Sequence, residues 1–179
     1  MVSSEEDLAL AVSDALLNVD GELSSAGASV VDAQTLNNRN GQVMGDVSLV
    51  LTTRGALLNQ GGTLGAAERL QVTAASLDNS QSGSLVSDGS LTAKVGGLLD
   101  NQDQGRVMAK GAMAVQAGAL DNRGGRVSGQ DLLTLSGDRL DNRGGAVRAN
   151  QALDLAIGEV DNRAATEIYT LSLHDALPI

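Results

Sequence analysis

An asparagine recurs along this chain at steps of 20 to 22 residues, and no other feature constrains the fold so strongly. The eight positions are Asn18, Asn38, Asn59, Asn79, Asn101, Asn122, Asn142 and Asn162. A glycine follows each of the first seven, at Gly21, Gly41, Gly62, Gly83, Gly105, Gly125 and Gly145. After Asn79 and Asn101 one extra residue separates the asparagine from its glycine. A fixed period that tolerates insertion at one point predicts stacked coils with a surface turn at that point.

Aliphatic residues occupy further columns of the same repeat. One column lies two positions before the asparagines, from Leu16 to Val160, and another lies two positions after the glycines, from Leu23 to Val147. A small residue follows two positions later, and then an alternating L-x-L pair, so that the consensus is roughly L-D-N-x-x-G-x-V-x-A-x-x-x-L-x-L-x-x-x-x. V-x-A and L-x-L both have the period of two that is typical of strands with one buried face. The unit is too short to hold a helix of two or three turns as well.

These patterns predict an all-β fold, a parallel β-helix (solenoid) of coils of about 20 residues. We expect neighbouring coils to pair in parallel about 4.8 Å apart. Aromatic residues make up only 1% of the chain, which indicates a narrow interior of Leu, Val, Ala and Ile. A leucine-rich repeat would place its asparagine three residues after L-x-L, whereas Asn142 follows Leu135 by seven. The nonapeptide calcium-binding repeat is excluded because the chain has no G-G-x-G-x-D run.

The asparagine and glycine columns have a structural explanation. Both residue types tolerate positive φ, so we interpret these columns as turns. The asparagine amides could also form hydrogen bonds from coil to coil. At Gly125 we expect a side chain to be disfavoured for one of two reasons: either the residue has a positive φ, or an added Cβ would collide with the neighbouring coil. The sequence therefore predicts structural turn columns here, with no catalytic, cofactor-binding or metal-binding residue among them.

Aspartates form a second file when the repeats are stacked: Asp78, Asp100, Asp121, Asp141 and Asp161. Carboxyl groups about 5 Å apart are typical of retaining glycosidases, some of which could use such a fold. That chemistry needs two carboxyl groups in different environments, whereas these aspartates share the same neighbours. Arginines two residues further on, at Arg123, Arg143 and Arg163, can offset the repulsion. We expect a solvated ladder at the outer turn, with a weak cation site as the alternative and no cofactor.

Composition narrows the classes of partner. The net charge of −10 argues against nucleic acid, which demands clustered Lys and Arg. No apolar run approaches the roughly 18 to 20 residues that span a bilayer, so we expect no membrane insertion. The chain has no cysteine, and its first residues, MVSSEEDLALAV, are acidic where a signal peptide would be basic. We therefore expect any export signal to lie outside this segment.

The repeat stops after Arg163. Residues Glu167 to Ile179 can be back-translated into a string similar to a widely used short-read sequencing adapter. We expect residues 164–179 to be a non-native tail that does not continue the helix, and resequencing the source DNA would test this. His174 and Asp175 could be interpreted as a catalytic or metal pair, but we expect no chemistry from a single histidine in such a tail.

The units LDNRGGRVSGQDLLTLSGDR and LDNRGGAVRANQALDLAIGE resemble the haemagglutinin repeats of the filamentous haemagglutinin family. The resemblance rests on L-D-N-x-x-G-x-[VI] and weakens over residues 16–31, where Leu17 replaces the aspartate. It covers a β-helix of about seven full coils at residues 8–163, after a partial or frayed end at residues 1–7. The resemblance implies a right-handed helix that forms the shaft of a very large exoprotein.

Such exoproteins come from Gram-negative bacteria and reach the cell surface or the medium through an outer-membrane two-partner secretion transporter. The resemblance implies that functional regions lie elsewhere in the parent chain and that the shaft itself is not an enzyme. Three functions remain open: the shaft of an adhesin with an unidentified receptor, the shaft of a contact-dependent inhibition toxin, and a β-helical carbohydrate-active enzyme. The third would need a coil whose repeat is broken by clustered charged residues, and none is seen.

Overall fold

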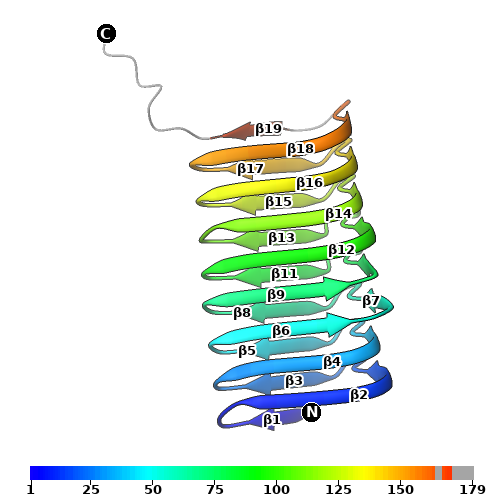
Figure 1. Cartoon of the computed structure of the whole chain (residues 1–179), viewed down its shortest axis with the longest axis vertical. Helices are drawn as coiled ribbons and strands as arrows, with labels where there is room; N and C mark the ends of the chain where they lie inside the picture. Colours follow the sequence, from blue (N-terminus) through cyan, green and yellow to red (C-terminus); the bar gives the residue numbers. More distant parts are fainter. Residues whose placement is uncertain (164–166, 171–179) are drawn as a thin grey trace.

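The computed structural model describes residues 1–163 and 167–170, and their regular structure is entirely β-strand. The strands form about eight turns of a parallel solenoid, stacked as flat layers along one axis (Figure 1). Each coil contributes a short strand to one sheet and a longer, bent strand to a second sheet on the other side of the core. The predicted fold class, an all-β parallel β-helix, is confirmed.

The short-strand sheet contains nine strands in sequence order. They are β1 (Val2–Ser4), β3 (Glu22–Ser25), β5 (Gln42–Gly45), β8 (Thr63–Ala66), β11 (Ser84–Ser87), β13 (Arg106–Ala109), β15 (Arg126–Gly129), β17 (Ala146–Ala149) and β19 (Glu167–Thr170). This sheet holds the V-x-A part of the repeat, so Val107, Val127 and Val147 are Cα partners on successive coils.

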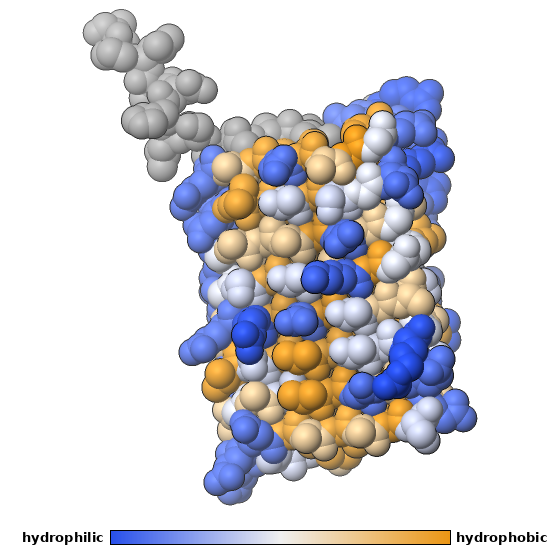
Figure 2. Space-filling model, viewed as in Figure 1, coloured by the Kyte–Doolittle hydropathy of each residue, from blue (hydrophilic) through white to orange (hydrophobic). Residues whose placement is uncertain are grey.

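The long-strand sheet contains ten strands. They are β2 (Leu8–Leu17), β4 (Ala28–Asn37), β6 (Ser48–Thr53), β7 (Ala56–Leu58), β9 (Arg69–Ala74), β10 (Ser76–Asp78), β12 (Ser90–Asp100), β14 (Met113–Asp121), β16 (Leu132–Asp141) and β18 (Ala152–Asp161). Leu133 pairs with Met113 on one side and Leu153 on the other, as the repeat predicts. The outer face of this sheet mixes apolar and polar side chains (Figure 2), and Val30 is 47% exposed there.

The core is a single cluster of the aliphatic columns. In the middle coils Leu57, Leu64, Leu70 and Val127 are fully buried. At the ends the same columns are less protected, because an end coil has a neighbour on one side only: Val160 is 44% exposed. Burial of a large aliphatic side chain contributes about 1.5–3 kcal/mol, so each added coil stabilises the coils beside it.

The long strand continues further than the L-x-L signal predicts. It bends after L-x-L and runs on through the Leu-Asp pair to the asparagine, and where the bend interrupts it the last part becomes the separate strands β7 and β10. The bend also absorbs extra residues: the register of β12 against β14 shifts between Val95 and Leu98. We expected insertions at one corner only, and this expectation is wrong. The bend accepts them as well, because the backbone ladder re-forms on the far side of a bulge.

Both ends of the stack extend beyond the repeat as we bounded it. Residues Val2–Ser4 form β1 and pair with β3, which completes a first coil. Residues Glu167–Thr170 form β19 and pair with β17, with Ile168 in register with Val147. The expectation that the helix stops after Arg163 therefore differs from the structure, since an open sheet edge accepts any extended segment. His174 and Asp175 lie outside the described residues.

Candidate functional site

The asparagine and glycine columns form the corner between the long strand and the next short strand. In the four-residue corners the glycine N–H donates to the asparagine carbonyl, at 3.0 Å from Gly125 to Asn122. Positive φ belongs to the residue before the glycine, such as Asn40 at 53° and Gly124 at 66°. This is the pattern of a type II turn, with its third residue left-handed. Our attribution of positive φ to the asparagine and glycine columns themselves is therefore wrong.

The two longer corners, at Asn79 and Asn101, connect the same two strands with one more residue. At Asn79 the turn begins one residue later, and Gly83 donates to the carbonyl of Ser80 at 3.0 Å. Its two central residues, Gln81 and Ser82, have φ of 53° and 67°. Two successive left-handed residues are typical of a type I′ turn. The change of turn type explains why an insertion is tolerated here.

The asparagine side chains point into the protein and form a continuous ladder. The Asn101 side chain is fully buried, and its Nδ2 donates to Oδ1 of Asn122 at 2.7 Å. The same nitrogen donates to the carbonyl oxygens of Gly105 and Arg126, both at 3.2 Å. Equivalent amide–amide bonds link every consecutive pair of the column from Asn18 to Asn162. Buried amides are costly unless paired, so this ladder fixes the alignment of successive corners.

The glycine column is restricted to glycine because the backbone of the preceding coil lies very close to it. A Cβ on Gly125 would collide with the carbonyl oxygen of Asn101 in the preceding coil and lie 2.7 Å from Oδ1 of Asn122. Of the two explanations that we offered for this column, the neighbouring coil is the one the structure shows. Gly124 differs, because a Cβ there would meet nothing within 4 Å.

The aspartate file lies just outside the asparagine ladder and divides into two halves. The upper half, toward the C-terminus, has an arginine two residues after each aspartate, and the lower half has none; they are Asp121, Asp141 and Asp161, and Asp78 and Asp100. In the upper half each arginine forms a two-pronged bond with the aspartate of its own coil, as from Arg143 Nε and Nη2 to Asp141 at 2.9 and 2.7 Å. A weaker contact of 3.9 Å joins Arg123 to Asp141 on the next coil. In the lower half Asp100 accepts hydrogen bonds from the backbone and side chain of Gln102, at 3.1 and 2.9 Å.

Asp141 and Asp100, one from each half, lie in opposite electrostatic environments. The hydrogen bonds from Arg143 lower the pKa of Asp141. Burial raises the pKa of Asp100, and the like charges of Asp78 and Asp121 add to that effect. Over residues 1–163 and 167–170, no group of three or more acidic or histidine side chains is placed to hold a metal ion.

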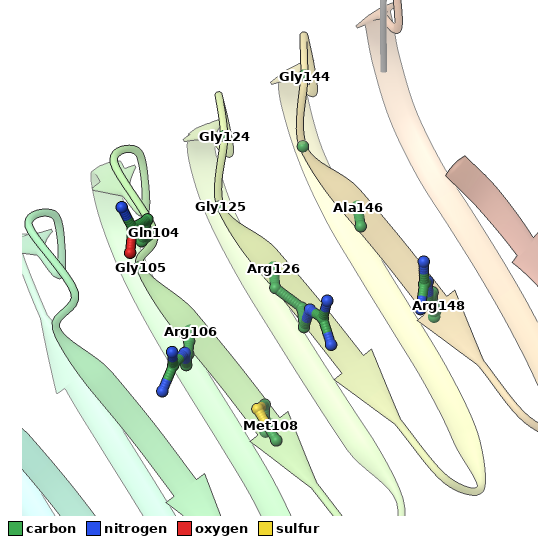
Figure 3. Close-up of a pocket in the computed structure, with 11 residues that line it drawn as sticks. Gln104, Gly105, Arg106, Met108, Gly124, Gly125, Arg126, Gly144, Ala146 and Arg148 are labelled. Atoms are coloured by element: carbon green, nitrogen blue, oxygen red, sulfur yellow. The ribbon is translucent and has the colours of Figure 1, made fainter. Parts of the chain in front are cut away.

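A groove of about 450 Å³ crosses the outer face of the short-strand sheet (Figure 3). Arg106, Arg126 and Arg148 project from neighbouring coils on this face, beside Met108. Arg106 and Arg126 are exposed and in register, whereas Arg148 is half-buried. Gly124 and Gly144 line the corner end of the groove, where the lack of side chains leaves it open.

A family model of the haemagglutinin repeat matches residues 2–61, 58–116, 86–156 and 140–168. This chain belongs to the haemagglutinin-repeat family. No curated protein and no solved structure matches it. Nor does the described part of this haemagglutinin-repeat chain contain a helix long and apolar enough to cross a membrane.

The groove was missed by the sequence reasoning, although the repeat carried the signal. In haemagglutinin-repeat coils the residue after the glycine and the residue two positions later face outward from the short strand. Arg106 and Arg126 occupy the first of these columns and Arg148 the second. The sequence analysis followed only the columns that repeat one residue type, and the outward columns, where a surface site of a solenoid must lie, do not repeat one type.

Proposed function

We propose that this chain is a structural shaft segment of a large secreted or cell-surface adhesin, displaying binding regions located elsewhere in the parent chain. The parent would be exported by an outer-membrane two-partner secretion transporter of a Gram-negative bacterium. The shaft would act by holding those regions at a distance, without catalysis of its own.

One observation carries this proposal: both sheets and the asparagine ladder continue in parallel through the whole stack. The backbone of each inner coil is bonded to the coils on both sides, and each inner asparagine has an asparagine above and below. A stack of this kind resists bending, and its length increases by about 4.8 Å with every coil. Membership of the haemagglutinin-repeat family supports the same role.

The reach of the parent exoprotein tests the structural role. Removal of residues 18–161 in frame joins Leu17 to Asn162, so that the repeat continues in phase after whole coils have been lost. We expect the shortened protein to be exported and folded, and a distal epitope to lie about 35 Å closer to the cell surface. An unchanged epitope distance would contradict the shaft.

The coding sequence that surrounds this segment tests the adhesin. An adhesin predicts further haemagglutinin repeats and a distal binding region. A toxin domain at the end of the gene, followed by a small immunity gene, would instead identify the shaft of a contact-dependent inhibition toxin.

A further inference from the structure

The outward residues of the short strands form a palindrome along the stack. Burial alternates along each of these strands, so the first and third residues face outward. The third residues of β3 to β15 are Cα partners on six successive coils, and they are Ser24, Met44, Gly65, Val86, Met108 and Ser128. Serines stand at both ends, methionines come next, and Gly65 and Val86 lie in the middle. This column therefore has nearly the same chemistry when it is followed in either direction.

The first residues of the same strands are complementary when the column is reversed. They are Glu22, Gln42, Thr63, Ser84, Arg106 and Arg126. Reversal brings Glu22 opposite Arg126 and Gln42 opposite Arg106, and it leaves the two hydroxyl residues opposite each other. Arg106 and Arg126 are exposed and project from neighbouring coils beside Met108 (Figure 3). A surface that repeats apolar residues and has opposite charges at mirrored positions is complementary to a second copy of itself.

We propose that two copies of this chain pair face to face and antiparallel through their short-strand sheets. The twofold axis runs along the strands and passes between β8 and β11, so that β3 packs against β15 and β5 against β13 of the second copy. Strand β1 then packs against β17, which sets Ser3 opposite Arg148. Strand β19, which carries Glu167 in register with Ala146, lies past β1 of the second copy and faces none of its described coils. This inference goes beyond the shaft role, because it gives the shaft a lateral surface for a second copy of itself.

The corner residues that follow the short strands favour one register of the pair. These are Asp46, Ala67, Asp88 and Lys110, after β5, β8, β11 and β13. In the proposed register Asp46 lies opposite Lys110, and Asp88, which Lys110 bonds at 2.8 Å within its own copy, lies opposite Ala67. A shift by one coil in either direction would place Asp88 opposite Asp46 or opposite Asp88 of the second copy. A parallel pair would instead set Arg106 and Arg126 at the same height as their own copies.

The apolar centre allows the two sheets to interlock. A groove of about 390 Å³ is lined by Met44 and Val86, on either side of the coil that holds Gly65. In the proposed register Val86 of one copy lies over Gly65 of the other. Met44 leans over this position, with its sulfur 2.6 Å from the place of a Cβ on Gly65, and a methionine side chain can move to fit. Met108, which is 37% exposed in the single chain, would be covered by Met44 of the second copy.

The size of this face predicts a weak dimer. Eight coils at about 4.8 Å and four residues at about 3.3 Å give a footprint of roughly 500 Å² on each copy. The total of roughly 1,000 Å² is at the lower end for specific interfaces. Each copy also has a net charge of −10, and this long-range repulsion is screened at about 0.15 M salt, where the Debye length is about 8 Å. We expect a dissociation constant between about 10 µM and about 1 mM.

Sedimentation equilibrium of the full chain at about 0.15 M salt tests the pairing. We expect monomers and dimers in an equilibrium that depends on concentration. Glu22→Arg and Arg126→Glu should each weaken the dimer about tenfold, because a symmetric interface contains each substituted position twice and attraction becomes repulsion. The exchange variant Glu22→Arg/Arg126→Glu should restore the dimer. As a matched control, Arg69→Glu makes the same change of charge at an exposed residue of the long-strand sheet and should leave the dimer unchanged.

Spin labels test the antiparallel arrangement. The chain has no cysteine, so a single label at Gln130→Cys or Asn150→Cys reports only the distance between two copies. The twofold axis places the two labels five coils apart for Gln130 and seven coils apart for Asn150, which gives about 24 and 34 Å along the stack. Circular dichroism would establish that each variant is folded. The proposal is overturned if the folded chain stays monomeric up to about 1 mM, if Arg69→Glu weakens the dimer as much as Arg126→Glu, if the exchange variant fails to restore it, or if the two labels give equal distances.

Discussion

A buried core residue, Leu133, and an exposed ion pair, Asp121–Arg123, should contribute very differently to stability. Leu133 is fully buried between Met113 and Leu153, whereas Arg123 is a surface side chain bonded to Asp121 at 2.6 Å. We expect Leu133→Ala to lower the free energy of unfolding by about 2–5 kcal/mol, because a thin core leaves a cavity. Replacement of both Asp121 and Arg123 by serine should cost about 0–1 kcal/mol. Urea titration measures both, and a larger loss from the serine pair would contradict the assignment of the core columns.

Two adjacent glycines should respond differently to substitution. Gly125→Ala places a Cβ against the carbonyl oxygen of Asn101, so it must displace the neighbouring coil. Gly124→Asn places a side chain in open space, and Asn40 already holds the required positive φ at the equivalent corner. We expect the first change to cost more than about 2 kcal/mol and the second less than about 1 kcal/mol. Thermal or urea denaturation that gave the reverse order would contradict the close approach of the coils at Gly125.

The contributions of Asp100 and Asp141 to stability should depend on pH with opposite signs. The folded-state pKa of Asp141 is lowered, so this group stabilises the fold above the ordinary value of about 3.9, and the contribution is lost as the pH falls through the folded pKa. The folded-state pKa of Asp100 is raised, so its ionisation costs stability above that pKa.

Asparagine variants separate these two signs. At pH 7 we expect Asp141→Asn to lower the urea midpoint and Asp100→Asn to raise it, with both differences shrinking toward pH 3. Midpoints that moved in the same direction at pH 7 would contradict the two environments.

Residue by residue, the sequence predicted the inward columns because burial imposes a period on them. The repeat of Leu, Val and small residues is sufficient to place Leu133 between its two neighbours. It could not reveal that the asparagines are buried, because an asparagine at a corner is equally compatible with a solvated turn. Nor did it distinguish Asp100 from Asp141, whose difference depends on the identity of a residue two positions later, Gln102 or Arg143.

At the scale of the element, each coil combines rigid strands with corners that accept insertion. The sequence predicted the short strand and the first part of the long strand, both of which alternate. It did not predict the continuation of the long strand beyond its bend, since the residues there, such as Gly96 and Gly97 in β12, do not alternate. Backbone hydrogen bonds to the neighbouring coils hold this part in place. Such bonds impose no pattern of side chains, so the sequence of one coil does not predict them.

A one-residue insertion should therefore be tolerated at a corner and rejected in a strand. Insertion of asparagine between Arg123 and Gly124 creates the five-residue corner seen at Asn79 and Asn101, and should cost about 1 kcal/mol or less. The same insertion between Val127 and Ser128 turns the rest of β15 to the opposite face and should cost several times more. Equal urea midpoints for the two insertions would contradict the division of the coil into strands and corners.

For the whole molecule, the central claim is that every repeat adds one layer along a single axis. The outward positions Ser3, Val86, Met108 and Ser128 belong to one column of Cα partners in the short-strand sheet. Ser3 is separated from the other three by four, five and six coils. Because the chain has no cysteine, spin labels can be placed at chosen pairs alone.

Double electron–electron resonance between a label at Ser3→Cys and a second at Val86→Cys, Met108→Cys or Ser128→Cys measures this spacing directly. The solenoid predicts distances of about 19, 24 and 29 Å, rising by about 4.8 Å for each added coil. Distances that stayed constant, or that did not increase steadily from Val86 to Met108 to Ser128, would contradict the stacked-coil structure.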